Sequence, residues 1–133
     1  MINGNESKAN DIIRISNAMD MFESAQRTFY SIIGNHDDGS FTSTNFPLFS
    51  KAEQYALYQR HNILNLDYSS DSECYGYKDF DQFGIRLIYL DSCYGTNGHS
   101  STSWGYSDDE VTWLSTDALN TENQVVIFSH MGF

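Results

Sequence analysis

The sequence has few prolines, few cysteines and few basic residues. It has one proline, two cysteines, and seven Lys plus Arg residues against 18 Asp plus Glu, which gives a net charge of −11. Because a surface this acidic repels phosphate backbones, nucleic-acid binding is not expected. Cys74 and Cys93 sit in unrelated local contexts without a metal-ligand spacing, so we expect two thiols rather than a disulfide.

Long hydrophobic runs are also missing. No apolar stretch approaches the roughly 20 residues that span a bilayer, and no signal-peptide pattern opens the chain. We therefore expect no membrane partner and a cytoplasmic or otherwise soluble location. There is no Gly-x-Ser-x-Gly motif and no plausible His partner for either cysteine, which argues against a serine or cysteine hydrolase.

What is present describes an ordinary globular protein. The 133 residues suit one domain spanning 1–133, and 40% of them are hydrophobic. Aromatic residues make up 15% of the chain, which favours a core that contains strands over a helical bundle.

Hydrophobic spacing and capping residues predict the order of helices and strands. Helices are expected over 5–27, 50–61 and 107–119, the last opened by an S-x-x-E capping box at Ser107 and Glu110. Buried strands are expected over 28–33 and 125–128, a hairpin over 75–80 and 85–91, and a long loop over 92–105. Because strands alternate with helices, the sequence predicts an α/β domain, whose ligands would bind beyond the carboxyl ends of the strands.

Two groups of polar residues follow predicted strands. Gly34-Asn35-His36-Asp37 comes directly after the first strand, where a glycine allows a tight turn and a close approach to a ligand. An Asn oxygen is a neutral ligand for a divalent cation, and a neighbouring His can donate a proton. The alternative interpretation is a plain polar turn, because Gly, Asn and Asp are common turn residues.

The second group is a histidine after the last strand. His130 follows the apolar run that ends at Phe128, and an imidazole at the end of a buried strand is well placed to bind a metal. A hydrogen-bonded core histidine is the alternative.

These segments resemble one family in the same order along the chain. Ile33-Gly34-Asn35-His36-Asp37 is similar to the Gly-Asn-His-Asp/Glu block of calcineurin-like metallophosphoesterases. The helix with Trp113-Leu114, followed by Val125 to His130, resembles the family's helix and its strand leading to a Ser-His. The hairpin strand that ends at Ser92 is similar to the family's central strand. The resemblance implies a partial metallophosphatase-type layered α/β/β/α sandwich with a mixed sheet.

The resemblance also implies a chemistry. It implies two divalent metal ions, Mn, Fe, Zn or similar, and a small-molecule phosphoester substrate, either a monoester or a diester. Asn35 and His130 would ligate one of the metals. His36 would be the non-ligand histidine that stabilises the transition state or protonates the leaving oxygen. Asp37 would hold His36 or the loop in place, unless it is only a turn residue.

The chain departs from the family at both ends. The earlier Asp-x-His and Gly-Asp-x-x-Asp blocks and the later Gly-His-x-His are not present. Asn3 is interpreted as standing in place of the last Asp of the second block; the alternative is that Gly4-Asn5 replaces its Gly-Asp. A dinuclear site needs roughly six or more ligands, and two neutral ones cannot hold two cations against water. We therefore expect an incomplete domain that is inactive or nearly so, and the alternative is a non-catalytic structural or binding module.

Overall fold

The computed structural model describes residues 8–25, 30–34, 37, 49–60, 66–69, 74–92 and 105–131. It is a mixed α/β structure with a mixed sheet, which confirms the predicted fold class at that level. Asn35, His36 and residues 93–104 of the predicted loop lie outside the described residues. Within the described part of the chain, no helix is both long enough and apolar enough to span a membrane.

The order of elements follows the prediction except near residue 30 and at Tyr68–Ser69, where the structure has a short strand that was not predicted. The helices are α1 (Lys8–Ser24), α2 (Lys51–Arg60) and α3 (Asp108–Trp113), with a short 3-10 turn η1 (Asp81–Phe83) and a π-helical turn η2 (Leu114–Ala118) that continues α3. The strands are β1 (Tyr68–Ser69), β2 (Gly76–Phe80), β3 (Ile85–Tyr89) and β4 (Gln124–Phe128).

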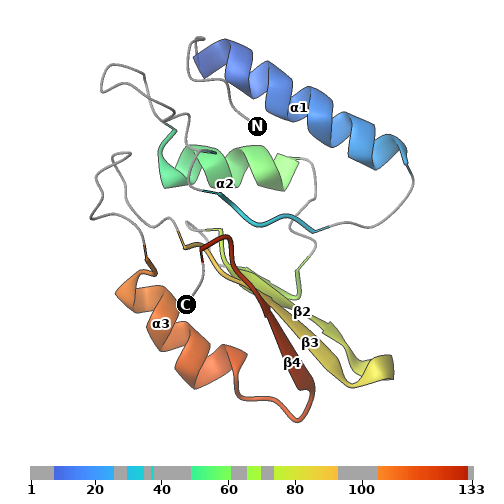
Figure 1. Ribbon diagram of the computed structural model, residues 1–133, viewed down its shortest axis with the longest axis vertical. Coiled ribbons are helices and arrows are strands. Elements are labelled where there is room, and N and C mark those ends of the chain that lie inside the picture. The colour runs from blue at the N-terminus through green and yellow to red at the C-terminus, as the bar shows by residue number, and fades with distance from the viewer. Residues whose placement is uncertain are drawn as a thin grey trace.

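The strands form one sheet in the order β1-β2-β3-β4, of which β2, β3 and β4 can be followed in Figure 1. The first two pairings are antiparallel, and β3 and β4 run parallel, joined through α3. In the last pair Ile88 stands beside Ile127 and Tyr89 beside Phe128. The carboxyl ends of β3 and β4 therefore lie at the same edge of the sheet, which is where ligands bind in open α/β sheets.

The hairpin between β2 and β3 is closed by the turn that its sequence predicts. Phe80 pairs with Ile85, and the Gly84 N–H donates to the Asp81 carbonyl at 3.1 Å. Gly84 has a φ of 62°, in the left-handed region that glycine adopts without a steric penalty. A Cβ at this position would meet nothing within 4 Å, so the backbone conformation rather than space calls for the glycine.

Side-chain caps define the starts of α2 and α3. The Ser107 hydroxyl accepts the Glu110 N–H at 3.1 Å, as the predicted capping box requires. A second box, which the sequence analysis did not identify, opens α2. There the Ser50 hydroxyl accepts the Glu53 N–H at 3.3 Å, and the Glu53 carboxylate accepts the Ser50 N–H at 2.9 Å. Each cap satisfies N–H groups that a helix end leaves without partners.

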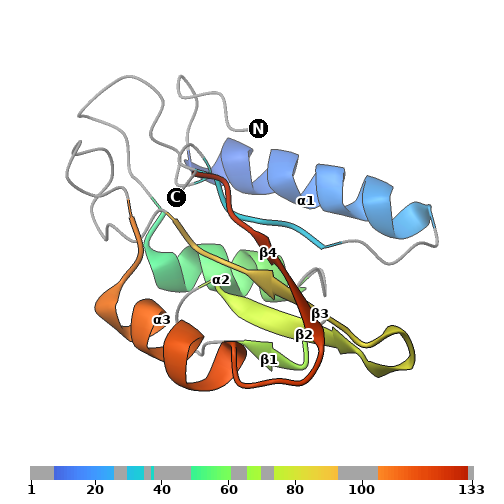
Figure 2. The same ribbon diagram turned by 60° about the horizontal axis from the view of Figure 1, so that its bottom comes forward.

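The two sides of the sheet are covered by different helices (Figure 2). On one side, α3 and η2 bury a cluster made by Tyr75, Ile88, Leu90, Trp113 and Ala118. On the other side lie α1, α2 and the stretch 30–34, which form a second cluster. Its buried members are Ile15, Met19, Ile33, Phe49, Leu57 and Cys74. Cys74 is thus a buried thiol, while Cys93 lies outside the described residues.

Two predictions about burial and pairing are wrong. Residues 30–33 pair with no strand in the described part of the chain, although Ile33 is buried as expected. Tyr30 is held by side chains instead: its ring stacks on Tyr89 with centroids 5.4 Å apart. The strand predicted over 125–128 exists as β4, but it lies at the edge of the described sheet and is largely exposed, because one neighbour only, β3, covers it.

The first helix ends earlier than predicted. It ends at Ser24, with the Ala25 N–H bonded to the Phe22 carbonyl at 3.1 Å, and residues 5–7 of the predicted range lie outside the described residues. Ile15 and Met19 face the core, as their spacing of four predicts, but Phe22 is about half exposed.

Candidate metal centre

The predicted glycine turn is closed by two hydrogen bonds. The Asp37 N–H donates to the Gly34 carbonyl at 3.0 Å, which is the bond of a four-residue turn. In return, the Gly34 N–H donates to the Asp37 carboxylate at 2.8 Å. Asp37 is therefore bonded to Gly34 through both its N–H and its carboxylate.

The ring of His130 lies against this turn. A Cβ added at Gly34 would be 3.3 Å from His130 Cε1, 3.4 Å from His130 Nδ1 and 3.4 Å from the Asp37 carboxylate. The imidazole and the Asp37 carboxylate therefore both lie close to the side of Gly34 from which a side chain would project. The glycine lets the ring approach the backbone more closely than nearly any side chain would allow. His130 itself is exposed, so its ring is open to solvent as well as to the turn.

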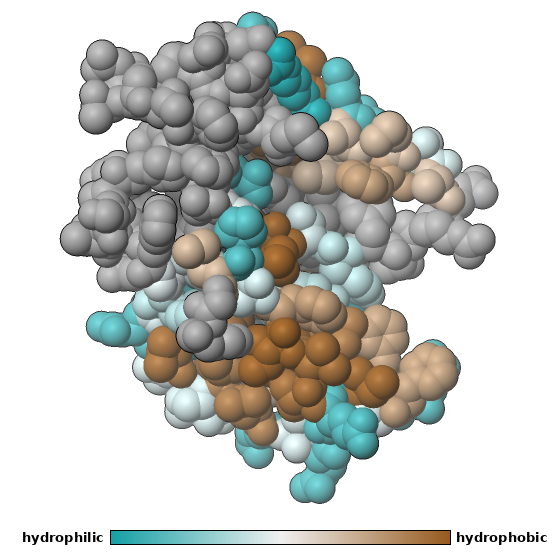
Figure 3. All heavy atoms as spheres, viewed as in Figure 1, coloured by the Kyte–Doolittle hydropathy of each residue, from teal (hydrophilic) through white to brown (hydrophobic). Residues whose placement is uncertain are grey.

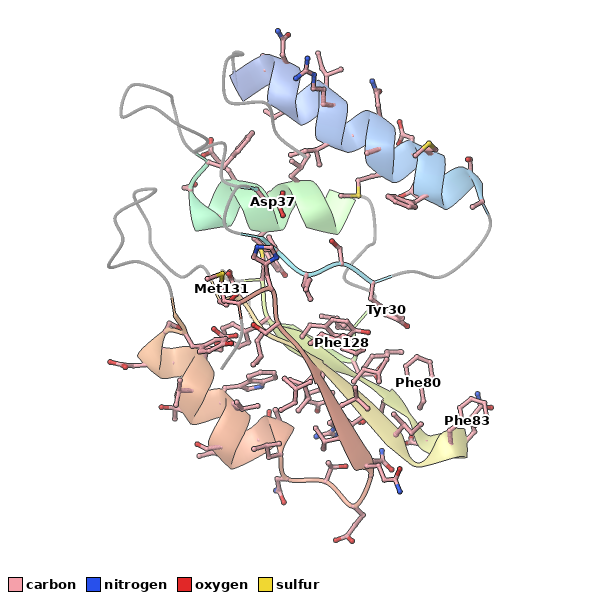
Figure 4. The ribbon with its side chains drawn as sticks, in the orientation of Figure 1. Tyr30, Asp37, Phe80, Phe83, Phe128 and Met131 are labelled. Carbon is pink, nitrogen blue, oxygen red and sulfur yellow. The ribbon has the colours of Figure 1, made fainter. Side chains whose placement is uncertain are left out.

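The segment after β4 is held in place by neighbours from two other parts of the chain. The Met131 N–H donates to the hydroxyl of Ser92, which is fully buried just beyond β3. Tyr106 and Ser129 share a hydroxyl hydrogen bond of 2.8 Å, and both hydroxyls reach the Met131 carbonyl. His130 lies between Ser129 and Met131, so these bonds fix the backbone that carries the imidazole. Figure 4 shows Asp37 and Met131 near the same end of the sheet, with Phe83 at the other end.

The end of β3 is anchored to the start of α3. The Asp91 N–H donates to a carboxylate oxygen of Glu110 at 2.7 Å, and both residues are almost completely buried. Glu110 also receives the cap from Ser107 through its own N–H. One residue therefore joins the first turn of α3 to the strand end that leads to Ser92, which stiffens the support of the site.

The opposite end of the sheet carries an ion pair with two parallel hydrogen bonds. Arg86 on β3 donates through Nε and Nη2 to the two Asp79 oxygens, each at 2.7 Å, and through Nη1 to the Ala118 carbonyl at 3.0 Å. Its guanidinium also lies 3.8 Å from the centre of the Tyr77 ring. The hydrogen bonds from Arg86 lower the pKa of Asp79, and the same bonds raise the pKa of Arg86. This network joins β2, β3 and η2 and has a structural role.

Of the four predicted site residues, the structure describes two and brings both to Gly34. Asp37 and His130 both approach the position that a Cβ of Gly34 would occupy, while Asn35 and His36 lie outside the described residues. Within the described ranges, no group of three or more His, Cys, Asp or Glu side chains is arranged to hold a metal ion. The positioning residues Ser92, Tyr106 and Glu110 were not identified as parts of the site from the sequence. Of these three residues, only Glu110 belonged to a recognised sequence motif, the capping box that begins at Ser107.

Comparisons with protein-family models, with characterised proteins and with solved structures find no match to this chain.

Proposed function

We propose that the chain is part of a metal-dependent phosphoester hydrolase of the calcineurin-like type, built as a layered α/β/β/α sandwich. The observation that carries the proposal is the approach of the His130 ring to Gly34, to within 3.3 Å of the position of a Cβ. Gly34 and His130 are far apart in the sequence and belong to the two motifs on which the family resemblance rests. Their meeting is what a shared metal centre requires.

The roles of the residues follow from this arrangement. Asn35 is bonded to Gly34, so the side-chain oxygen of Asn35 and the imidazole of His130 are the two groups that would hold one cation. A metal pair in such enzymes supplies a nucleophilic hydroxide and offsets the charge on the phosphoryl oxygens. His36 would stabilise the transition state or give a proton to the leaving oxygen, and Asp37 keeps the turn closed through the Gly34 N–H.

Asn35 and His130 are suitable types of metal ligand, but two ligands are too few for two metal ions. An exposed imidazole and an amide oxygen are ordinary ligands of Mn, Fe or Zn ions. Two neutral ligands are too few for a dinuclear site, because each cation must exchange several waters for protein donors. The proposal therefore assigns hydrolysis to a protein that also carries the remaining motifs, and little or no hydrolysis to these 133 residues alone.

The flanking sequence of the gene provides the first test. We expect an Asp-x-His and a Gly-Asp-x-x-Asp block before this chain and a Gly-His-x-His after it. The extended protein should then hydrolyse p-nitrophenyl phosphate or bis-p-nitrophenyl phosphate with Mn²⁺. Asn35→Ala and His130→Ala should each reduce kcat/KM at least 100-fold. Asn120→Ala, an exposed asparagine beyond η2, is the matched control and should change kcat/KM less than twofold. A complete gene without those motifs would overturn the assignment.

A non-catalytic structural or binding module is the second candidate, because the described residues include one predicted metal ligand only, His130. The two candidates differ in the response to metal. A ligand that binds the native state raises its stability by about 2.7 kcal/mol at 100 times Kd. The extended protein should therefore melt several degrees higher in excess Mn²⁺ if it is the enzyme. An unchanged melting temperature favours the module.

A further inference from the structure

The residues that follow β4 are held chiefly by polar bonds. Figure 3 shows apolar side chains gathered over the part of the molecule where β4 lies. The apolar run of β4 ends at Phe128; beyond it Ser129 and Met131 are half-buried and His130 is exposed. Because packing alone does not fix an exposed side chain, the orientation of the His130 imidazole depends on how the backbone on each side of it is held.

Tyr106, Ser129 and Met131 form a short chain of hydrogen bonds with one consistent order of protons. A hydroxyl carries one proton, so each of the two hydroxyls gives a full bond to one acceptor only. The Met131 carbonyl lies 2.8 Å from the Ser129 hydroxyl and 3.3 Å from the Tyr106 hydroxyl, so the serine is the better placed donor. The Tyr106 O–H then donates to the Ser129 Oγ at 2.8 Å. Tyr106 therefore sets the direction in which Ser129 closes the backbone around His130.

The same bonds close a ring through Ser92. The Met131 N–H donates to the Ser92 Oγ at 3.1 Å, and the Ser92 carbonyl accepts the Gly105 N–H at 3.0 Å. Gly105 precedes Tyr106, so the ring of bonds returns to the tyrosine through the backbone. The φ of Gly105 is 144°, in the range that favours glycine. The ring joins the end of β3, the start of α3 and the segment that carries His130.

The aromatic ring of Tyr106 anchors these bonds in the core. Tyr106 is half-buried and packs against the cluster that α3 and η2 bury, which contains Ile88 and Trp113. Its neighbour Ser107 is the cap of α3. Since both the ring and the backbone of Tyr106 are held, its phenol oxygen is a fixed point against which Ser129 is oriented.

We propose that Tyr106 is a positioning residue for the metal centre, and that it sets the imidazole of His130 against Gly34 by way of Ser129. The proposal rests on the proposed function in one respect, the role of His130 as a metal ligand. Groups that orient a ligating histidine typically change metal affinity about 10–100-fold when they are removed. Tyr106 acts through a serine and the backbone, so we expect an effect of about tenfold, at the low end of that range.

Nuclear magnetic resonance of this chain without metal tests the positioning by itself. Tyr106→Phe keeps the ring in the core and removes the bond to Ser129. The nuclear Overhauser effect between a Gly34 α-hydrogen and the His130 ε1 hydrogen should fall to less than about half, because it depends steeply on distance and the imidazole should move by about 0.5 Å. Tyr77→Phe, at another tyrosine packed on the same cluster, is the matched control and should leave the effect unchanged. An unchanged effect in Tyr106→Phe, or an equal loss in Tyr77→Phe, overturns the proposal.

Ser129 variants separate action through the serine from a general loss of stability. Ser129→Ala should weaken the same Overhauser effect, and Ser129→Thr, which keeps a hydroxyl, should retain most of it. Because Tyr106 acts through Ser129, the double variant should lose no more than Ser129→Ala alone. An additive loss in the double variant overturns the proposed link. If Tyr106→Phe does not fold, the comparison of Ser129→Ala with Ser129→Thr decides.

The extended protein tests the consequence for the metal. Titration calorimetry should show that Mn²⁺ binds Tyr106→Phe about tenfold more weakly than wild type, and Tyr77→Phe as tightly as wild type. Equal Mn²⁺ affinity in wild type and Tyr106→Phe overturns the role of Tyr106 in the metal centre. A wild type that binds no Mn²⁺ overturns the proposed function instead, and the metal-free spectra then decide whether Tyr106 positions the imidazole.

Discussion

The strands β3 and β4 are neighbours with similar sequences and opposite environments. Both have five residues, rich in branched and aromatic side chains, and they pair in parallel. Ile88 is 0% exposed and Ile127 beside it is 36% exposed; Tyr89 is 5% exposed and Phe128 beside it is 40% exposed. The difference comes from position, because in the sheet of the described residues β3 has a strand on each side and β4 has one. β3 therefore carries stability, while β4 leads into the candidate metal centre.

The largest expected effect compares the paired isoleucines. Ile88→Ala should lower the free energy of unfolding by about 2–5 kcal/mol, because it leaves a cavity in the core under α3. Ile127→Ala should cost less than about 1.5 kcal/mol, because solvent already reaches that side chain and fills the space. Urea unfolding of the two variants measures both. Equal losses would contradict the contrast between the two strands. If Ile88→Ala is too unstable to purify, Ile88→Val should still cost about 0.5–1.5 kcal/mol.

The buried charge on β3 gives the next largest effect. Asp79→Asn should cost about 1–3 kcal/mol at pH 7, because it weakens two charge-assisted hydrogen bonds to the poorly exposed Arg86. Asp81→Asn on the neighbouring turn is the matched control; Asp81 is exposed, so its loss should stay within about 0.5 kcal/mol.

The same pair predicts a dependence on pH. The pKa of Asp79 in the folded protein lies below its ordinary value of 3.8, chiefly because of the bonds from Arg86. A carboxylate with a lowered pKa stabilises the fold above its unfolded pKa and loses that contribution as pH falls through the folded pKa. The stability difference between wild type and Asp79→Asn should therefore be constant from pH 7 to 5 and shrink below about pH 4. A difference that grows in acid would exclude the ion pair as its source.

A smaller effect is expected at the helix that covers β3. Ser107→Ala should lower the free energy of unfolding by about 1 kcal/mol, because the Glu110 N–H loses its cap. Ser115→Ala provides the comparison, since the Ser115 hydroxyl bonds a helix carbonyl at the surface and its loss should be almost neutral. Thermal melts of the two variants measure the difference, and a Ser115 effect as large as the Ser107 effect would contradict it.

The smallest change in stability is expected for Gly34→Ala, close to the end of β4. Its main effect should be a local change in the NMR spectrum of His130. Gly34→Ala adds a methyl group 3.3–3.4 Å from the His130 ring, and this exposed ring can shift by a few tenths of an ångström. We expect a stability loss below about 1 kcal/mol and a clear change in the NMR signals of His130. Gly84→Ala should behave in the opposite way. It should cost about 1–2 kcal/mol because of its positive φ, and leave His130 unchanged. An unchanged His130 spectrum in Gly34→Ala would contradict the contact.

Much of the fold could be predicted from local signals. The hairpin followed from its alternating strands and Gly84, the start of α3 from Ser107, and β4 from its apolar run. The exposure of β4 could not be predicted, because a run of apolar residues has the same sequence pattern in a central strand and in an edge strand. That residues 30–33 pair with no strand in the described part of the chain likewise depends on which segments lie beside them. In both cases the missing information is the neighbours, which belong to distant parts of the chain.

The candidate site was predictable in its chemistry and not in its supports. Asp37 and His130 were identified because their residue types follow predicted strands, and both lie at Gly34. Ser92 and Tyr106, which hold the backbone around His130, come from the ends of the predicted loop and have no motif of their own. These hydrogen bonds join residues that are distant in the sequence, so they depend on the folded path of the chain and have no local signal.

One distance tests the account most directly. Gly34 carries an α-hydrogen in the direction of the missing Cβ, and that position lies 3.3 Å from His130 Cε1. A nuclear Overhauser effect between a Gly34 α-hydrogen and the His130 ε1 hydrogen should therefore be strong in the wild-type chain, without added metal. Its absence in a folded sample with both signals assigned would mean that the two motifs do not meet, and the proposed metal centre would be wrong.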